Sequence, residues 1–282
     1  MGDMIALSVL VLGAIGVVSA TLLYVVSKRF HVHEDSRIAE VGALLPGANC
    51  GGCGYNGCHD FASACCKATS LDGLHCPGAG NEGMAKIANL LGLTAAVTEA
   101  KVAVLKCNGT CQARPQRAVY DGASSCAVAN LTGSGPTACA AGCLGLGDCV
   151  SACRFGALSI DTETGLPVID REKCTACGLC VKACPRLLLE LRRKGPRGMR
   201  VWVACNNRQR GVPARKACEN ACIACSKCLK ECTHDAIVVA DNLSVIDPAK
   251  CKLCRKCVNV CPTGAILTAN FPVKKLEKAA EA

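Results

Sequence analysis

The chain has 282 residues, of which 27 are cysteine and only 3% are aromatic, and its formal net charge is +10. This length allows a few small domains, and so few aromatic side chains argue against one large hydrophobic core. A disulfide scaffold is a poor explanation for the cysteines, because their number is odd, the chain is long and they recur at the spacing of metal ligands.

The amino-terminal segment from Met4 to Val26 contains no charged residue. As a helix it would be roughly 34 Å long, enough to cross a bilayer. A cleaved signal peptide has a basic start and a shorter apolar run, whereas here Lys28 and Arg29 follow the run. We therefore expect residues 1–27 to be a retained single-pass anchor in the inner or plasma membrane, with every cysteine on the cytoplasmic side. The alternative is a buried helix of a soluble domain.

The first group of cysteines follows a short polar helix predicted over residues 31–45. The glycines around these cysteines would let the backbone wrap closely about a metal centre. A second helix is predicted over residues 59–68, where Cys65 and Cys66 lie outside the ligand spacing and are interpreted as small buried residues. The C-x2-C-x4-C-x17-C pattern predicts a [4Fe-4S] cluster, with zinc as the alternative. Its ligands would be Cys50, Cys53, Cys58 and Cys76.

The middle of the chain carries cysteines without a recognisable ligand spacing. We expect a short helix over residues 82–93 and a strand over residues 101–105, followed by a segment rich in glycine, serine and threonine. Two interpretations of the three cysteines here stay open, a sixth cluster with a fourth ligand from elsewhere or free buried thiols. These cysteines are Cys107, Cys111 and Cys126.

The run from Cys251 to Pro262 has the spacing C-x2-C-x2-C-x3-C-P, which holds [4Fe-4S] clusters in bacterial ferredoxins. The fourth cysteine of such a run binds a different cluster from the first three, so each run needs a partner run. The cysteines from Cys222 to Cys232 provide that partner, and the run ending at Cys184 has the same form. Zinc sites rarely use this spacing twice over and followed by proline.

This arrangement is repeated within the chain. Residues 102–108 resemble residues 201–206, and the cysteines from Cys139 to Cys153 align with those from Cys218 to Cys232. Leu146 then stands where Cys225 stands in the second copy, so we expect Cys139 to replace the missing ligand. A β-hairpin is predicted after each first half, over residues 157–169 and 237–246. The predicted sites are Cys139, Cys143, Cys149 and Cys184; Cys153, Cys174, Cys177 and Cys180; Cys222, Cys225, Cys228 and Cys261; and Cys232, Cys251, Cys254 and Cys257.

Five clusters would use 20 of the 27 cysteines, leaving Cys65, Cys66, Cys107, Cys111, Cys126, Cys205 and Cys218. Each four-thiolate cluster carries about −2 when oxidised, so the clusters would offset the basic charge of the chain, which argues against nucleic-acid binding. We expect an α+β fold with an anchor at 1–27, an N-terminal [4Fe-4S] domain at 28–92, a connecting segment at 93–136 and two tandem two-cluster ferredoxin domains at 137–200 and 201–270. A basic tail at 271–282 ends the sequence.

The chain resembles the B subunit of the Rnf ion-translocating ferredoxin:NAD oxidoreductase (electron transport) complex. The resemblance covers the anchor, then LLPGANCGGCGYNGC, VLKCNGTC and CLGLGDCVSACRFGAL, and then the ferredoxin-type runs. It implies that such a protein accepts electrons from reduced ferredoxin and passes them to integral membrane subunits and to NAD- and flavin-binding subunits, coupled to Na⁺ or H⁺ translocation. The sequence itself contains no P-loop motif, and no catalytic residue is assigned.

Two other functions are compatible with the cysteine pattern, a membrane-tethered polyferredoxin module serving a different redox enzyme and a non-catalytic metal store. The basic runs at 192–197 and at 274–275 are interpreted either as a docking surface for an acidic ferredoxin or as a solvated face that balances the cluster charge.

Overall fold

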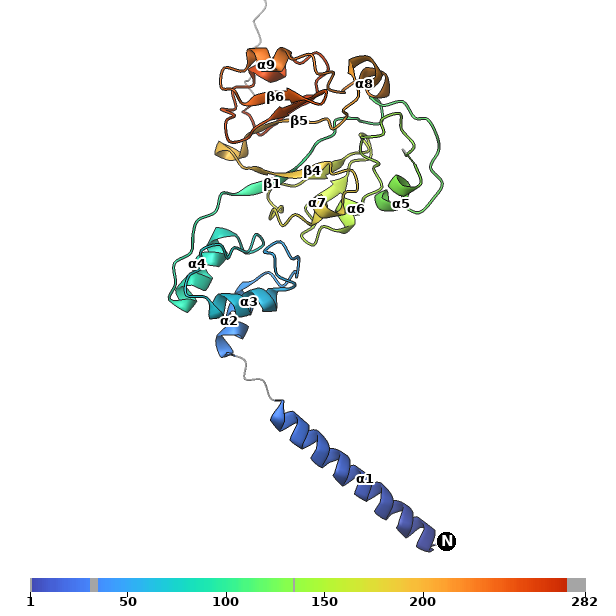
Figure 1. Ribbon diagram of the computed structural model, residues 1–282, viewed down its shortest axis with the longest axis vertical. Helices are drawn as coiled ribbons and strands as arrows, with labels where there is room; N and C mark the ends of the chain where they lie inside the picture. Colours follow the sequence, from blue (N-terminus) through green and yellow to red (C-terminus); the bar gives the residue numbers. More distant parts are fainter. Residues whose placement is uncertain (1, 31–34, 134, 273–282) are drawn as a thin grey trace, which may run out of the picture.

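The computed structural model describes residues 2–30, 35–133 and 135–272. Helix α1 (Gly2–Arg29) stands apart from the rest of the molecule (Figure 1). All its described side chains, from residue 6 onward, are exposed, and an 18-residue stretch within Ala6–Arg29 has a mean hydropathy of 2.5. The helix is therefore long and apolar enough to cross a membrane, and the uncharged segment expected from the sequence lies within it.

A small helical unit follows α1, made of α2 (Ser36–Leu44), α3 (Cys58–Lys67) and α4 (Gly80–Leu91). Asp35 begins α2, because its carboxylate accepts a hydrogen bond of 3.0 Å from the backbone N–H of Arg37. Gly92 ends α4 with a φ of +67°, a conformation that glycine adopts without strain. The core of the unit is apolar and contains Phe61, Leu71, Met84 and Ile87. The helices expected at 59–68 and 82–93 are confirmed within a few residues, whereas residues 31–34 lie outside the described part.

Two structural repeats form the rest of the molecule, each with a helical turn, a β-hairpin and a second helical turn. The hairpins expected from the sequence are confirmed. The first repeat contains α6 (Asp148–Ser151), β2 (Leu158–Ile160), β3 (Pro167–Ile169) and α7 (Leu179–Ala183). The second contains α9 (Lys227–Glu231), β6 (Ile237–Ala240), β7 (Leu243–Ile246) and α10 (Lys256–Asn259).

In each repeat a strand that precedes the cysteine runs pairs with a strand that follows them. Antiparallel pairs join β1 (Lys101–Leu105) to β4 (Leu189–Arg193) and β5 (Arg200–Val203) to β8 (Ile266–Ala269). The sequence predicted β1 but neither β4 nor β8. The 3₁₀ turn η1 (Pro196–Gly198) joins β4 to β5, and the two further helices are α5 (Cys126–Leu131) and α8 (Gly211–Ala217).

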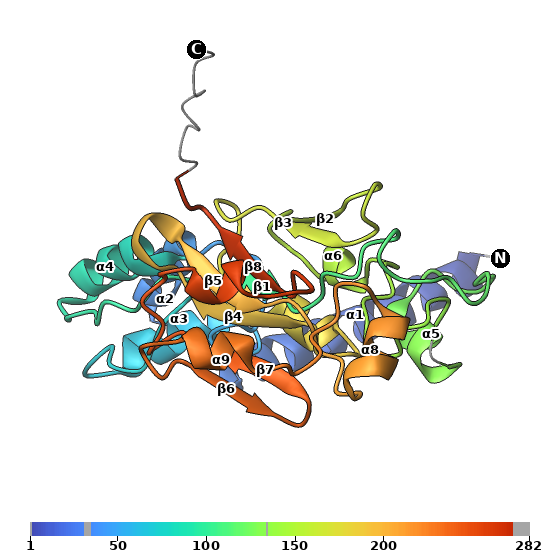
Figure 2. The ribbon, with the colours of Figure 1, turned by 90° about the horizontal axis from the view of Figure 1, so that it is seen from above.

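The two repeats pack together along these paired strands (Figures 1 and 2). The buried side chain of Trp202 on β5 contacts Val104 on β1, and its indole Nε1 donates a hydrogen bond of 2.9 Å to the carbonyl oxygen of Leu105. We call this boundary the seam. The seam unites the two repeats through buried contacts between β1 and β5, which position the two cysteine-rich halves relative to each other.

Candidate iron–sulfur sites

All 27 cysteines are free thiols. Among the residues that the structure describes, no three Cys, His, Asp or Glu side chains gather tightly enough to hold a single metal ion. A zinc ion, with Zn–S bonds of about 2.3 Å, needs its sulfurs within roughly 4 Å of one another. The cysteines instead line pockets in groups of four, an arrangement compatible with a polynuclear cluster.

The second repeat has two cavities lined by the cysteines predicted for it. Non-glycine residues between these cysteines adopt left-handed backbone conformations, with φ of +52° at Ala224, +58° at Ser226, +59° at Leu253 and +64° at Arg255. Alternation of right- and left-handed residues directs backbone N–H groups into a concavity that favours anions. The first cavity is lined by Cys222, Cys225, Cys228 and Cys261, and the second by Cys232, Cys251, Cys254 and Cys257.

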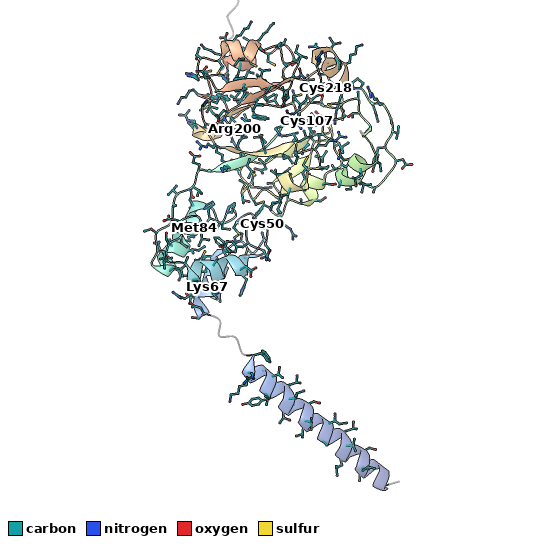
Figure 3. The ribbon with its side chains drawn as sticks, in the orientation of Figure 1. Cys50, Lys67, Met84, Cys107, Arg200 and Cys218 are labelled. Carbon is teal, nitrogen blue, oxygen red and sulfur yellow. The ribbon has the colours of Figure 1, made fainter. Side chains whose placement is uncertain are left out.

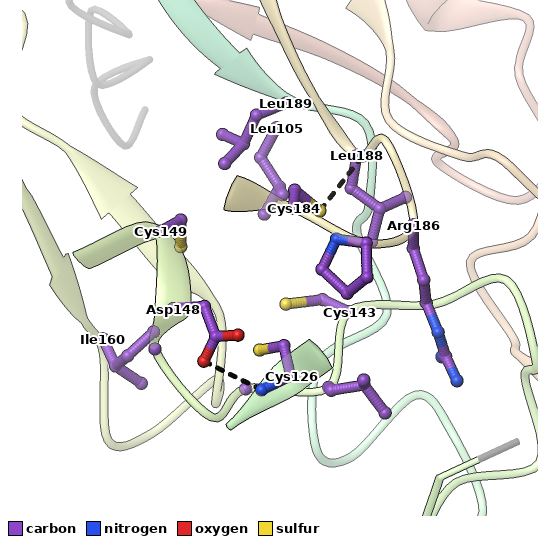
Figure 4. A pocket seen from close by; sticks show the side chains of 14 residues that line it. Leu105, Cys126, Cys143, Asp148, Cys149, Ile160, Cys184, Arg186, Leu188 and Leu189 are labelled. Carbon is purple, nitrogen blue, oxygen red and sulfur yellow. Dashed lines mark hydrogen bonds between the residues drawn. The ribbon is translucent and has the colours of Figure 1, made fainter. Parts of the chain in front are cut away.

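The first repeat has a matching cavity, but one of its cysteines is not the expected one (Figure 4). Cys143, Cys149 and Cys184 line it as the sequence predicted. The fourth is Cys126, at the start of α5, whereas Cys139 is not among the residues that line this cavity. The structure thus places Cys126, a residue outside the ferredoxin-type run, beside the three cysteines for which the spacing predicted Cys139 as the partner.

Asp148 holds Cys126 at this cavity. Its carboxylate accepts hydrogen bonds from the backbone N–H of Cys126 at 2.8 Å, from the N–H of Ala127 at 2.9 Å and from the Ser125 hydroxyl at 3.1 Å. Burial alone would raise the pKa of Asp148, but these donors outweigh it and lower the pKa below its ordinary value. The ionised carboxylate thus caps α5 from a neighbouring segment and fixes its first residue.

The remaining set of the first repeat contains Cys153, Cys174, Cys177 and Cys180. Burial raises the pKa of Cys180 to about 11, and the other three thiols of the set raise it further. In the neighbouring sets, burial raises the pKa of Cys143 to about 11 and that of Cys149 and Cys257 to about 12. Thiols with such pKa values are neutral at neutral pH, so metal binding would have to displace their protons.

The N-terminal unit contains Cys50, Cys53, Cys58 and Cys76, in and beside its apolar core. The Asn49 side chain accepts a hydrogen bond of 2.8 Å from the backbone N–H of Cys58, which ties the two ends of the glycine-rich loop together. Burial raises the pKa of Cys76, and the nearby Cys53 and Cys50 thiols raise it further. This loop meets the first repeat, because a Cβ atom at Gly52 would lie 2.7 Å from the carbonyl oxygen of Cys177.

The basic run at 192–197 is not a uniform solvated face. Arg192 is buried and donates hydrogen bonds to the carbonyl oxygens of Val201 and Ile246, at 3.3 Å and 3.1 Å. Arg193 forms an ion pair with Glu99 at 2.6 Å. The second basic run, at 274–275, lies outside the described residues.

Comparison with known proteins agrees with this chemistry. The family described as "4Fe-4S binding domain" matches residues 167–187 and 244–267, and the family described as "Putative Fe-S cluster" matches residues 45–68. With these matches and the cysteine-lined cavities, the chain is defined as an iron–sulfur protein that carries a membrane-compatible helix.

Relatives with the same organisation identify its family. The chain is 42% identical over 86% of its length, and over 71% of the relative, to the B subunit of the Na(+)-translocating ferredoxin:NAD(+) oxidoreductase complex of Acetobacterium woodii. It is 39% identical to the B subunit of the ion-translocating oxidoreductase complex of Methanosarcina acetivorans, over 94% of this chain and 99% of the relative. It is also 39% identical to the B subunit of the proton-translocating ferredoxin:NAD(+) oxidoreductase complex of Clostridium ljungdahlii, over 91% of this chain and 89% of the relative. The chain belongs to the B-subunit family of Rnf-type ion-translocating oxidoreductase complexes, and it is an iron–sulfur electron-transfer subunit of such a complex.

Proposed function

We propose that this chain is the electron-entry subunit of its complex. It accepts electrons from reduced ferredoxin and relays them toward membrane subunits and NAD-reducing subunits, and the whole complex couples this transfer to ion translocation. The names of the relatives support ferredoxin as donor and NAD⁺ as acceptor, and they differ on the ion, since one names Na⁺ and another the proton. The chain itself supplies no NAD site in this proposal.

We assign five [4Fe-4S] sites, four of them as the sequence predicts and one revised. The revised site uses Cys126 in place of Cys139, since Cys126 lines the cavity. A bound cluster supplies reversible one-electron transfer. The protein supplies the four thiolates and backbone N–H donors around each site. The sites are Cys50, Cys53, Cys58 and Cys76; Cys126, Cys143, Cys149 and Cys184; Cys153, Cys174, Cys177 and Cys180; Cys222, Cys225, Cys228 and Cys261; and Cys232, Cys251, Cys254 and Cys257.

In our division of the chain, residues 1–27 are a retained single-pass anchor, residues 28–92 the N-terminal cluster domain, and residues 137–200 and 201–270 the two ferredoxin domains. Residues 93–136 connect them and contribute β1 and α5 to the first ferredoxin domain. Lys28 and Arg29 in the last turn of α1 favour a cytoplasmic location for everything that follows.

The observation that carries the proposal is the succession of cysteine sets from the anchor to the far end of the molecule. The N-terminal unit touches the first repeat at Cys177, and within that repeat the Cys149 and Cys180 thiols interact electrostatically. In the second repeat Cys257 interacts in the same way with Cys228. The second repeat lies at the end farthest from α1 (Figure 1), which suits it to meet a soluble donor.

Three exposed cations surround the outermost site, and we call them the distal basic surface. They are Lys252, Arg255 and Lys256, which line the cavity of Cys232 and Cys257 together with the cysteines. The Arg255 guanidinium also lies 4.6 Å from the centre of the Phe271 ring. An acidic ferredoxin would be attracted to this surface, and its electron would enter at the adjacent site.

The experiment that tests the proposal is ferredoxin oxidation by the complex purified anaerobically in detergent. Replacement of Cys257 by Ala removes a ligand of the outermost site, and we expect ferredoxin oxidation to fall at least tenfold. Cys111→Ala, an exposed thiol outside all five sites, should leave it unchanged. Unchanged oxidation by the Cys257 variant, or purification without flavin-containing integral membrane subunits, would contradict the proposed role.

A further inference from the structure

Four buried cysteines remain at the seam once the five sites are assigned. Cys107 follows β1 and Cys205 follows β5, so they hold corresponding places in the two repeats. Cys139 and Cys218 also correspond, because Cys139 stands four residues before Cys143 and Cys218 four residues before Cys222. Their exposed fractions are 7%, 9%, 6% and 5%, in the order in which they are named here. Each repeat therefore contributes one matched pair of buried thiols to the boundary between the repeats.

The two pairs meet across the seam in a symmetric way. A Cβ atom at Gly109 would lie 3.4 Å from the Sγ atom of Cys218 and 3.6 Å from the Sγ atom of Cys107, so these sulfurs flank one point. Figure 3 labels Cys107 and Cys218 in the same region of the molecule. The corresponding residue of the second repeat is Asn207. Its backbone N–H donates to the Cys205 sulfur and its side-chain amide lies 3.8 Å from the Cys139 sulfur.

Backbone donors to the four sulfurs obey the same symmetry. The N–H of Cys143 donates to Cys107 Sγ at 3.4 Å, and the N–H of Cys222 donates to Cys205 Sγ at 3.3 Å. Cys139 and Cys218 each accept a hydrogen bond from the backbone N–H two residues later, which belongs to Ala141 and Asn220 respectively. Such donors stabilise sulfur that carries negative charge, as cluster ligands do.

A buried arginine beside the four sulfurs points to an anionic occupant. Arg114 is only 5% exposed, its Cδ atom lies beside the Gly109 position, and its charge is felt by both Cys139 and Cys218. One of its terminal nitrogens donates to the carbonyl oxygen of Cys143, but its Nε has no hydrogen-bond partner in the described part of the chain. A buried guanidinium among neutral thiols is costly, whereas an anionic centre would compensate its charge.

We propose that Cys107, Cys139, Cys205 and Cys218 bind a sixth [4Fe-4S] cluster at the seam, with two ligands from each repeat. This set differs from the one that the sequence suggested, because Cys126 belongs to the first-repeat cavity and Cys111 is exposed. The Cys107 and Cys205 sulfurs accept hydrogen bonds from Cys143 and Cys222, which are ligands of the adjoining sites in the proposed function. The seam site therefore supplies the link between the two repeats that the five sites leave open.

The count of metal in the full chain tests this proposal first. Protein purified anaerobically from the membrane should contain about 24 iron and 24 acid-labile sulfide per chain, against about 20 of each for five clusters. A wild-type count of about 20 would overturn the seam site and leave the five-site proposal intact. Protein with no iron at all would overturn both, so the two failures can be told apart.

Substitutions then locate the site. The variant Cys107→Ala/Cys218→Ala should lose about four iron and one reduced-cluster EPR signal, and electron transfer from the second repeat to the first should slow at least tenfold. The matched control Cys111→Ala, four residues from Cys107, should keep the full count. A double variant that keeps all its iron, or a control that loses four, would overturn the assignment. If the double variant does not fold, the single variant Cys218→Ala takes its place, with the same expected loss and the same refuting outcome.

Discussion

The role of Asp148 gives a sharp test of the revised first-repeat site. The carboxylate holds Cys126 through three hydrogen bonds, two of them from the first backbone N–H groups of α5. Replacement by Ala removes all three acceptors and leaves the helix start uncapped. We therefore expect Asp148→Ala to loosen one ligand of one site and to leave the other sites intact.

The size of this effect follows from the cost of losing a helix cap, about 0.5–2 kcal/mol. That free energy corresponds to a roughly 2- to 30-fold lower population of chains in which Cys126 stays at the cavity. Asp148→Asn keeps one oxygen acceptor and should fall between the wild type and the Ala variant. The defect should appear as faster loss of about four iron per chain, because only one cluster depends on this cap.

The measurement is the rate of iron release to a chelator, followed by absorbance and by EPR of the reduced protein. Asp35→Ala is the matched control, since Asp35 caps α2 in the same way but positions no proposed ligand. The reasoning is refuted if Asp148→Ala releases iron no faster than Asp35→Ala, or if Cys126→Ala retains the wild-type iron content.

Three further predictions concern the contact surfaces and the metal. Gly52→Ala would force a methyl group against the backbone of Cys177, at a cost of about 1–3 kcal/mol. We expect the N-terminal cluster to be reduced more slowly in this variant, at unchanged iron content. The control variant Gly42→Ala, which has open space around the new methyl group, should have no effect. Reversal of the three charges of the distal basic surface should slow ferredoxin association on the order of tenfold at low salt, as measured by stopped flow. The difference should vanish at high salt, because salt screens the charges. A defect that does not depend on salt would argue against electrostatic steering of ferredoxin. Removal of iron should expose the repeats to hydrogen exchange much more than helices α2–α4, because the N-terminal unit has an apolar core of its own; equal exposure of all regions would contradict this.

The sequence predicted the local parts of the sites well and the non-local parts poorly. Ligands that follow one another in a C-x2-C-x2-C loop are brought together by that loop alone, so spacing is sufficient for sets such as the one containing Cys251 and Cys254. Cys126 lies outside any such loop, and it is positioned by α5 and by the carboxylate of Asp148, 22 residues further along the chain. A capping interaction across that distance leaves no periodic signal in the sequence.

The same distinction applies to the strands. The hairpins β2–β3 and β6–β7 connect neighbours in the sequence, and their alternating apolar residues were sufficient to predict them. Strands β4 and β8 pair with strands from before the cysteine runs, over more than 60 residues in the case of β5 and β8. Because each is only four or five residues long, its pairing depends on the cores of the assembled repeats, and cysteines make up part of those cores.

The comparison of the two repeats shows that Cys139 and Cys218, which the ferredoxin-type sites do not require, occupy equivalent positions. In the second repeat Cys225 lies within the loop, and Cys218 had no place in a ferredoxin-type site. In the first repeat Leu146 replaces that loop cysteine, and Cys139 was the nearest substitute along the chain. If Cys126 completes the first-repeat site as we propose, Cys139 is unassigned like Cys218, and both copies then have the same unassigned cysteine at the same position. The two repeats differ in the cysteine proposed for one ligand position, yet each retains the same pair of buried thiols at the seam. This is expected if the four thiols bind one cluster that both repeats share.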